Sequence, residues 1–192
     1  MNPTFWRGKR VLITGHTGFK GSWLTLWLQQ CGAEILGYAL PPPSDSPSLY
    51  RLARVEQGIE SVIGDVREEG HFLAIVDEFQ PDIALHLAAQ ALVRESYVDP
   101  VETYSVNVMG TVHFLEAVRR TPDVKVALVI TSDKCYENRE WAWGYRENEP
   151  MAATTPTPAA KAVRNSSPPP TAHPSSERRA KGRSSQLRGQ EM

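Results

Sequence analysis

Three glycines, Gly15, Gly18 and Gly21, recur at every third position directly after the apolar run at residues 10–14. This spacing between a strand and a helix is typical of the phosphate-binding turn of dinucleotide folds. Gly15 permits the tight turn, Gly18 lets the backbone approach a pyrophosphate, and Gly21 lets helix and strand pack closely. An ordinary strand-to-helix turn does not need three glycines at this spacing, so we expect a dinucleotide site here.

A second candidate site is the polar triplet Ser132, Asp133 and Lys134, which follows an apolar run that starts at Val124. The simpler interpretation is a polar cap between a strand and a loop. We prefer a catalytic role, because the triplet lies at the carboxyl end of a predicted buried strand, where parallel sheets bind ligands.

The choice of dinucleotide stays open. The acid that usually binds the ribose is absent, since residues 38–40 read Tyr-Ala-Leu at the end of the second predicted strand. Ser44 and Asp45 lie further along and could substitute, and no arginine stands at the strand end for a 2′-phosphate. Asp65 closes the third predicted strand, where a carboxylate commonly faces an adenine, but a simple loop carboxylate is an equal alternative.

The elements that must position these residues alternate between strand and helix. We expect strands at residues 10–14, 34–40, 60–66, 82–89 and 124–132, and helices at residues 18–31, 68–79 and 101–120. In the first helix, Trp23, Leu24, Trp27 and Leu28 should share one buried face, and Gly32 suits its C-terminal cap. This alternation predicts an α/β fold with a doubly wound parallel sheet.

The chain of 192 residues divides into two unlike parts. Residues 1–150 hold every aromatic side chain and carry a net charge of -6, whereas residues 151–192 carry +5. The second part cannot bury enough apolar surface to offset its ordering entropy, so we expect it to be disordered. A basic tail could bind nucleic acid or an acidic membrane, but a solvated end is the simpler expectation. A doubly wound sheet needs a further helix and a sixth strand, so we expect a Rossmann domain truncated after about the fifth strand, with no substrate domain.

Several classes of protein are disfavoured by composition. Cys31 and Cys135 are too few and too distant to suggest a disulfide framework or a zinc site, and we expect no metal. The first residues lack the apolar run of a signal peptide, and no stretch approaches the length of a membrane span. We expect a soluble, cytoplasmic protein.

Three segments of the sequence resemble the extended short-chain dehydrogenase/reductase family: TGHTGFKGSWL, HLAAQALVRESYVDPVETYSVNVMGT and ITSDKCYEN. Within it, the nucleotide-sugar epimerases and dehydratases are similar, and the CDP-glucose 4,6-dehydratases most of all. The resemblance covers about residues 7–150. It implies a Rossmann fold, full-length relatives that are homo-oligomers, and a lyase of dideoxysugar and O-antigen biosynthesis that converts CDP-glucose to CDP-4-keto-6-deoxyglucose and water.

The resemblance also implies a tightly bound nicotinamide cofactor, NAD, although NADP is not excluded. In the family the cofactor takes hydride from sugar C4, water leaves across C5 and C6, and the hydride returns to C6. The implied cofactor-binding residues are Gly15, His16, Thr17, Gly18, Phe19, Gly21, Asp65, Val66, Leu87, Ala88, Ala89 and Thr131.

By the same resemblance, Ser132 hydrogen-bonds the C4 oxygen, and Asp133 acts as general acid on the departing C6 hydroxyl. Lys134 stands where many dehydratases have a glutamate. We expect His86 to be a packed core histidine, Asn107 to brace its helix against the fourth or fifth strand, and Cys135 to be a buried apolar side chain.

The catalytic tyrosine of the family, in a Tyr-x-x-x-Lys pair, has no counterpart after Ser132. If the codons from about Met151 are taken one base out of phase, residues 152–165 can encode GGYDPYSSSKGCAE, which resembles the segment that carries the pair. The final five residues can then encode RAGNV, a sixth strand. We therefore expect an out-of-frame tail in which Lys161 is not catalytic, and a chain that is inactive as translated. The alternatives are a natural tail, a 4-epimerase, which needs the same hydride step, and a non-catalytic nucleotide-binding or interaction protein.

Overall fold

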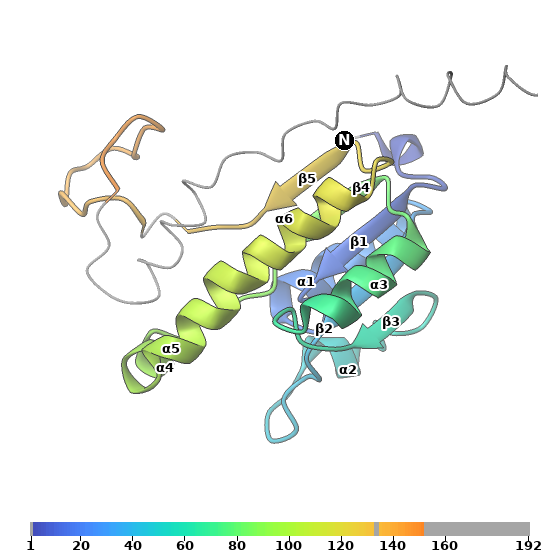
Figure 1. The fold of residues 1–192 in the computed structure, drawn as a ribbon, viewed down its shortest axis with the longest axis horizontal. Helices are drawn as coiled ribbons and strands as arrows, with labels where there is room; N and C mark the ends of the chain where they lie inside the picture. The colour runs from blue at the N-terminus through green and yellow to red at the C-terminus, as the bar shows by residue number, and fades with distance from the viewer. Residues whose placement is uncertain (1, 133–134, 152–192) are drawn as a thin grey trace, which may run out of the picture.

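A five-stranded parallel sheet forms the centre of the molecule in the computed structural model, which describes residues 2–132 and 135–151 (Figure 1). The strand order is β3-β2-β1-β4-β5. The strands are β1 (Arg10–Thr14), β2 (Glu34–Ala39), β3 (Glu60–Ile63), β4 (Ile83–His86) and β5 (Val126–Val129). The prediction of a doubly wound parallel sheet is confirmed, although β3, β4 and β5 are shorter than expected.

Strand β1 lies at the centre and pairs with β2 on one side and β4 on the other. Its apolar side chains alternate between two cores, as the two-residue period of a strand requires. Leu12 packs with Phe72 and Phe114, whereas Val11 and Ile13 pack with Leu28 on the opposite face. The apolar run at residues 10–14 therefore fills both faces of the sheet at once.

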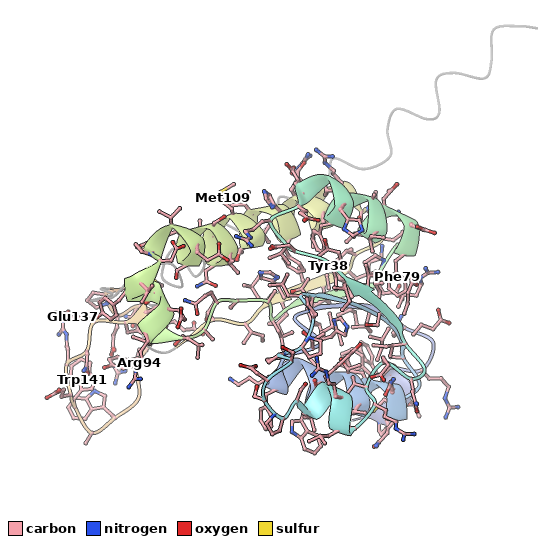
Figure 2. All side chains as sticks on the ribbon, turned by 90° about the horizontal axis from the view of Figure 1, so that it is seen from below. Tyr38, Phe79, Arg94, Met109, Glu137 and Trp141 are labelled. Carbon is pink, nitrogen blue, oxygen red and sulfur yellow. The ribbon has the colours of Figure 1, made fainter. Side chains whose placement is uncertain are left out.

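Helices cover each face of the sheet. Helix α1 (Phe19–Gln30) and the short α2 (Leu49–Leu52) lie on one face, and α3 (Glu69–Phe79) and α6 (Gly110–Arg120) lie on the other (Figure 1). Tyr38 and Phe79 belong to the core beneath α3 (Figure 2). A short 3₁₀ helix, Pro3–Phe5, precedes β1. Neither this helix nor α2 was expected from the sequence.

The expected buried face of α1 is partly wrong. The side chains that face the sheet are Gly21, Ser22, Thr25 and Leu28, whereas Trp23 is 56% exposed and Trp27 is 39% exposed. Small residues let the helix lie close to the strands, and this close approach leaves no room for an indole between them. The C-terminal cap is confirmed, since Gly32 has a φ of +79° just after the last turn.

The long helix expected at residues 101–120 consists of three consecutive pieces. Helix α5 (Pro100–Tyr104) leads into a π-helical turn, Ser105–Met109 (η2), and then into α6. A further short helix, α4 (Val93–Val98), precedes α5. Met109 points away from the sheet on the outer side of this helical rod (Figure 2).

Residues 135–151 extend beyond the carboxyl end of β5 as a segment with one isolated bridge, between Tyr136 and Met151 (Figure 1). Trp141 and Glu137 lie in this segment, apart from the sheet (Figure 2). The predicted tail lies outside the described residues, apart from Met151, so its disorder and reading frame stay predictions. Among the helices that the structure describes, none has the length and apolar character needed to cross a membrane.

Candidate cofactor-binding site

The glycine turn between β1 and α1 is built by close backbone contacts. Gly15 has a φ of +77°, and a Cβ atom there would lie 2.7 Å from the backbone nitrogen of Ala88. Its own N–H donates to Tyr38 O at 2.9 Å, and its carbonyl accepts from Gly18 N at 3.1 Å. Only glycine fits this position without strain, because the left-handed backbone and the neighbouring strand both exclude a side chain.

Gly21 has the packing role expected of it. A Cβ atom at Gly21 would lie 2.1 Å from Gly15 O, so the first turn of α1 touches the end of β1. Two further contacts hold the turn: Ser22 N donates to Gly18 O at 2.8 Å, and Ser22 Oγ donates to His16 O at 3.0 Å. The amino end of α1 is thereby fixed beside the glycine turn, an arrangement suited to an anion.

A cleft of about 180 Å³ opens at this turn, at the carboxyl ends of β1, β2 and β4. Eight predicted cofactor residues line it: Gly15, Thr17, Gly18, Asp65, Val66, Leu87, Ala88 and Ala89. Four lining residues were not predicted: Ala39, Leu40, Gly64 and Val106. Ala39 and Leu40 could have been inferred from their place at the end of β2, but Val106 comes from the π-helical turn and has no such signal.

The side chain of His16 lies away from the cleft, behind the glycine turn. It is fully buried, with Nε2 2.8 Å from Ser61 Oγ, which in turn lies 2.8 Å from the hydroxyl of Tyr50. Burial lowers the pKa of His16 to about 4, despite a backbone hydrogen bond with Tyr38 that opposes the shift. The imidazole is therefore neutral at pH 7 and has a packing role, and the assignment of His16 to the cofactor site stays a prediction.

Three other predicted cofactor residues do not line the cleft. Phe19, the first residue of α1, is 71% exposed, and Gly21 is covered by the turn. Thr131 is half-buried just beyond the end of β5. Of the twelve predicted positions, eight that follow β1, β3 and β4 line the cleft, whereas His16, the two positions in α1 and the one after β5 do not.

A buried polar chain supports the β4 side of the cleft. Thr14 Oγ1 accepts hydrogen bonds from the N–H groups of Leu87 and Ala88, both at 3.2 Å, and lies 2.7 Å from His86 Nδ1. His86 is fully buried and stacks on Phe114, with ring centroids 4.7 Å apart. The prediction that His86 is a packed core histidine is confirmed.

The carboxylate of Asp65 at the rim of the cleft is paired with Arg67. Arg67 Nε donates to both carboxylate oxygens, at 3.0 and 2.9 Å, and Arg67 N donates to Oδ1 at 2.9 Å. The same guanidinium contacts Glu102 on α5 through Nη1. These hydrogen bonds hold the pKa of Asp65 below its usual value, so the group is a carboxylate at pH 7. Both sequence interpretations survive, because the carboxylate lines the cleft while it serves a local ion pair.

Asn107 lies in the π-helical turn and hydrogen-bonds the backbone of the segment after β4. Its Oδ1 accepts from Gln90 N at 2.9 Å, and its Nδ2 donates to Gln90 O at 3.0 Å. The expected bracing is therefore present, but the partner is Gln90 in the loop that follows β4 and not a strand.

The structure places only one member of the polar triplet. Ser132 is half-buried, and its carbonyl accepts hydrogen bonds from Cys135 N at 3.4 Å and Cys135 Sγ at 2.8 Å. Cys135 is fully buried, as predicted. Asp133 and Lys134 lie outside the described residues, so the catalytic assignment of the triplet stays a prediction.

The sequence of the chain is similar to curated nucleotide-sugar enzymes. A family model described as GDP-mannose 4,6 dehydratase matches residues 12–167. CDP-glucose 4,6-dehydratase of Salmonella typhimurium is 56% identical over 156 residues, which cover 81% of this chain and 43% of that protein. GDP-mannose 4,6-dehydratase of Yersinia enterocolitica is 35% identical over 118 residues, covering 58% of this chain and 31% of that protein. The chain thus spans less than half the length of these relatives.

Solved structures of related enzymes share the fold. UDP-glucose 4-epimerase of Thermus thermophilus, in complex with NAD, matches with a TM-score of 0.68 and 29% identity over 80% of this chain and 48% of that one. At 22% identity, dTDP-glucose 4,6-dehydratase of Bacillus anthracis matches with a TM-score of 0.67 over 81% and 48%. The chain belongs to the GDP-mannose 4,6-dehydratase family, and the expected kinship with nucleotide-sugar dehydratases and epimerases is confirmed.

Proposed function

We propose that this chain is the cofactor-binding part of a nucleotide-sugar 4,6-dehydratase that acts on CDP-glucose in the cytoplasm. The single observation that carries the proposal is the 56% identity, over most of the chain, to a protein described as CDP-glucose 4,6-dehydratase. The cleft at the carboxyl ends of β1, β2 and β4 supports it, because such sheets bind nucleotides at the point where the strand order reverses.

The residues of the cleft fit NAD. Gly15 leaves backbone exposed where a Cβ atom would collide, and the amino end of α1 can bind a pyrophosphate beside it. Asp65 and Val66, at the rim, would contact the adenosine portion, and the small side chains of Ala88 and Ala89 leave room on the β4 side. When bound, the nicotinamide supplies a reversible hydride acceptor.

The chemistry assigned to this chain's own residues concerns protons. The hydroxyl of Ser132 would hydrogen-bond the C4 oxygen of the sugar and orient it. The carboxyl group of Asp133 would donate a proton to the C6 hydroxyl as water departs. Lys134 would carry a positive charge beside this carboxyl group, in place of the glutamate found in many relatives.

The domain organisation forms part of the proposal. Residues 1–150 would be an incomplete Rossmann domain, and residues 151–192 an out-of-frame tail that has replaced the Tyr-x-x-x-Lys segment. The match to the family model continues to residue 167, beyond this boundary. Sequencing the DNA around codon 151 tests the frameshift directly: an intact gene whose tail is encoded in phase would refute it.

Two experiments test the function. Isothermal titration calorimetry of the 192-residue protein with NAD should give saturable binding, and Gly15→Val, which fills the turn, should abolish it. No binding by the unsubstituted protein would contradict the cofactor assignment. The frame-corrected protein should then release one water from CDP-glucose, detected by mass spectrometry, and Asp133→Asn should lose that activity while still binding NAD.

A 4-epimerase is the second candidate, because UDP-glucose 4-epimerases match both in sequence and in structure. An epimerase would return a product of unchanged mass, so the same mass spectrum separates the two activities. A non-catalytic nucleotide-binding protein would bind NAD in the calorimeter and leave every nucleotide sugar unchanged after frame correction. A partner affinity lost on deletion of residues 151–192 would favour an interaction role.

A further inference from the structure

A continuous chain of hydrogen bonds crosses the core from the cleft to the π-helical turn. It begins at the backbone N–H groups of Leu87 and Ala88, passes through Thr14, His86 and Thr111, and ends at the carbonyl of Asn107. The three side chains in the middle are buried. The direction in which each hydrogen points can be worked out from both ends.

At the cleft end, the hydroxyl of Thr14 must donate to His86. A hydroxyl oxygen has two acceptor lone pairs and one hydrogen. The N–H group of Ala88 donates to Thr14 Oγ1 at 3.2 Å, and the N–H group of Leu87, which it shares with Thr14 O at 3.1 Å, also lies 3.2 Å from Oγ1. Both donors therefore face the lone pairs of this oxygen. The hydrogen of Thr14 is left for His86 Nδ1, 2.7 Å away, so this nitrogen is an acceptor and carries no proton.

At the helix end, the single hydrogen of the Thr111 hydroxyl is already used in another hydrogen bond. It donates to Asn107 O at 2.7 Å, one turn earlier in the helical rod. Its oxygen, 3.3 Å from His86 Nε2, can therefore only accept from the imidazole, and Nε2 must carry the proton. The two ends independently give the same tautomer, with the hydrogen on Nε2 and none on Nδ1.

At its far end, the chain of hydrogen bonds reaches Asn107, which makes further hydrogen bonds of its own. Asn107, whose carbonyl closes the chain, also grips both backbone groups of Gln90 with its side chain. The backbone that leaves β4 is thus held at residues 87–88 through Thr14 and at residue 90 through Asn107. Leu87, Ala88 and Ala89, which lie between or at these points, line the cleft. π-Helical turns are rare and occur frequently at functional sites.

We propose that His86 is a positioning residue, fixed as the neutral Nε2–H tautomer, which couples the π-helical turn to the β4 side of the cofactor cleft. His86 does not contact the cofactor in this role: it acts through Thr14 on the backbone that does. The effect on the cofactor rests on the proposed function, whereas the tautomer is a property of the protein alone.

The tautomer is tested first, without any ligand. In the 192-residue protein with ¹⁵N-labelled histidine, the signals of His86 are identified by their loss in His86→Gln. At pH 7 we expect a protonated Nε2 and an unprotonated Nδ1 in the long-range ¹H–¹⁵N spectrum. A proton on Nδ1, or averaging between both tautomers, would overturn the proposal whether or not NAD binds.

The coupling is tested at Thr111, which does not line the cleft. Thr111→Val keeps the shape but removes the acceptor for Nε2–H, whereas Thr111→Ser keeps the hydroxyl as the matched control. We expect the valine variant to shift the His86 nitrogen signals and to weaken NAD binding roughly three- to tenfold, as the loss of one buried hydrogen bond implies. The serine variant should bind NAD like the unsubstituted protein.

The outcomes are distinguishable. Equal NAD affinity in the valine and serine variants would refute the coupling. If the unsubstituted protein binds no NAD, the proposed function fails, and the tautomer spectrum still decides the assignment of His86. If Thr111→Val does not fold, Thr14→Ser and Thr14→Val replace the pair, since Thr14 Oγ1 is the other partner of the imidazole.

Discussion

Strands β1 and β5 belong to one sheet but are packed very differently. The three central residues of β1, Val11, Leu12 and Ile13, are fully buried between two neighbouring strands and two layers of helices. Strand β5 pairs with β4 alone in the described part of the chain, and its Val126 and Leu128 are each 50% exposed. Completeness of packing therefore declines from the centre of the sheet towards the β5 edge.

The difference matters because one half of the proposed site follows β1 and the other half follows β5. The glycine turn follows β1, where the backbone is fixed by contacts on every side. The polar triplet follows β5, whose outer side chains remain half exposed. The cleft beside the glycine turn is already formed in this structure, whereas the residues proposed for proton transfer follow a strand at the edge of the described sheet.

The largest effect is expected at the glycine turn after β1, and the variant that tests it is Gly21→Ala. The new methyl group would lie 2.1 Å from Gly15 O, a backbone atom that cannot move without disturbing β1. We expect a loss of about 3 kcal/mol or more in the free energy of unfolding, measured by urea denaturation followed by circular dichroism.

Gly70→Ala is the matched control for Gly21→Ala, since Gly70 also lies in the first turn of a helix but has open space around it. Alanine there should be neutral or stabilising by up to about 1 kcal/mol. Equal effects at the two glycines would contradict the close contact between α1 and β1.

The second test uses the pH dependence of the free energy of unfolding, to which His16 behind the glycine turn should contribute. His16 has a pKa lowered to about 4 in the folded protein by burial, against 6.5 when unburied. The folded state therefore favours the neutral form: its stability is fully present above pH 6.5 and is lost as the pH falls towards 4. We expect a loss of about 2 to 3 kcal/mol over this window.

The pH effect is measured by urea denaturation at intervals from pH 7.5 to 4.5 in the unsubstituted protein and in His16→Gln. The glutamine variant should be less stable at pH 7.5 but should show a shallower decline below pH 6.5. Parallel curves would show that His16 is not the source of the pH dependence.

The third test concerns the rim of the cleft after β3, which lies on the side of β1 away from β5. Arg67→Met removes the guanidinium that holds Asp65, so the pKa of Asp65 should rise, as followed by ¹³C titration of its carboxyl group. The accompanying loss of stability should be about 1 kcal/mol. Arg119→Met is the control, because its ion pair with Glu116 lies on the exposed side of α6 and should leave the pKa of Asp65 unchanged. An unchanged Asp65 pKa in Arg67→Met would contradict the pairing.

The smallest effect on stability is expected at the open edge. Leu128→Thr should change the free energy of unfolding by less than about 0.5 kcal/mol, because the leucine is half exposed. It should nonetheless reduce aggregation on heating, measured by light scattering, since edge strands pair readily with one another. Leu52→Thr removes a leucine that is more exposed, at 76%, but lies on α2 and not on a strand edge, so it should not reduce aggregation. Equal scattering from the two variants would show that the β5 edge is not the site of association.

The features that could be predicted from sequence are those that few residue types can satisfy. The positive φ of Gly15 and the contact at Gly21 leave a glycine signature, and apolar runs report strands buried on both faces. The prediction of the buried face of α1 was partly wrong because it placed the apolar indole side chains against the sheet. The residues that face the sheet are mostly small, and they let the helix approach the strands closely. The π-helical turn was missed because the pattern of apolar residues passes through it without a break. Hydrophobic periodicity carries no information on which backbone hydrogen bond is formed.

None of the five tryptophans of this protein is fully buried, and this has a practical consequence. Trp6 and Trp141 are half-buried, and Trp6 packs against the core that contains Leu28, whereas Trp23, Trp27 and Trp143 are exposed. The fluorescence of the exposed three reports water contact in the native protein, so its change on unfolding should be small. An optical probe of the interior therefore has to be introduced, and Phe114, fully buried against the sheet, is the natural position for a spectroscopically distinct indole.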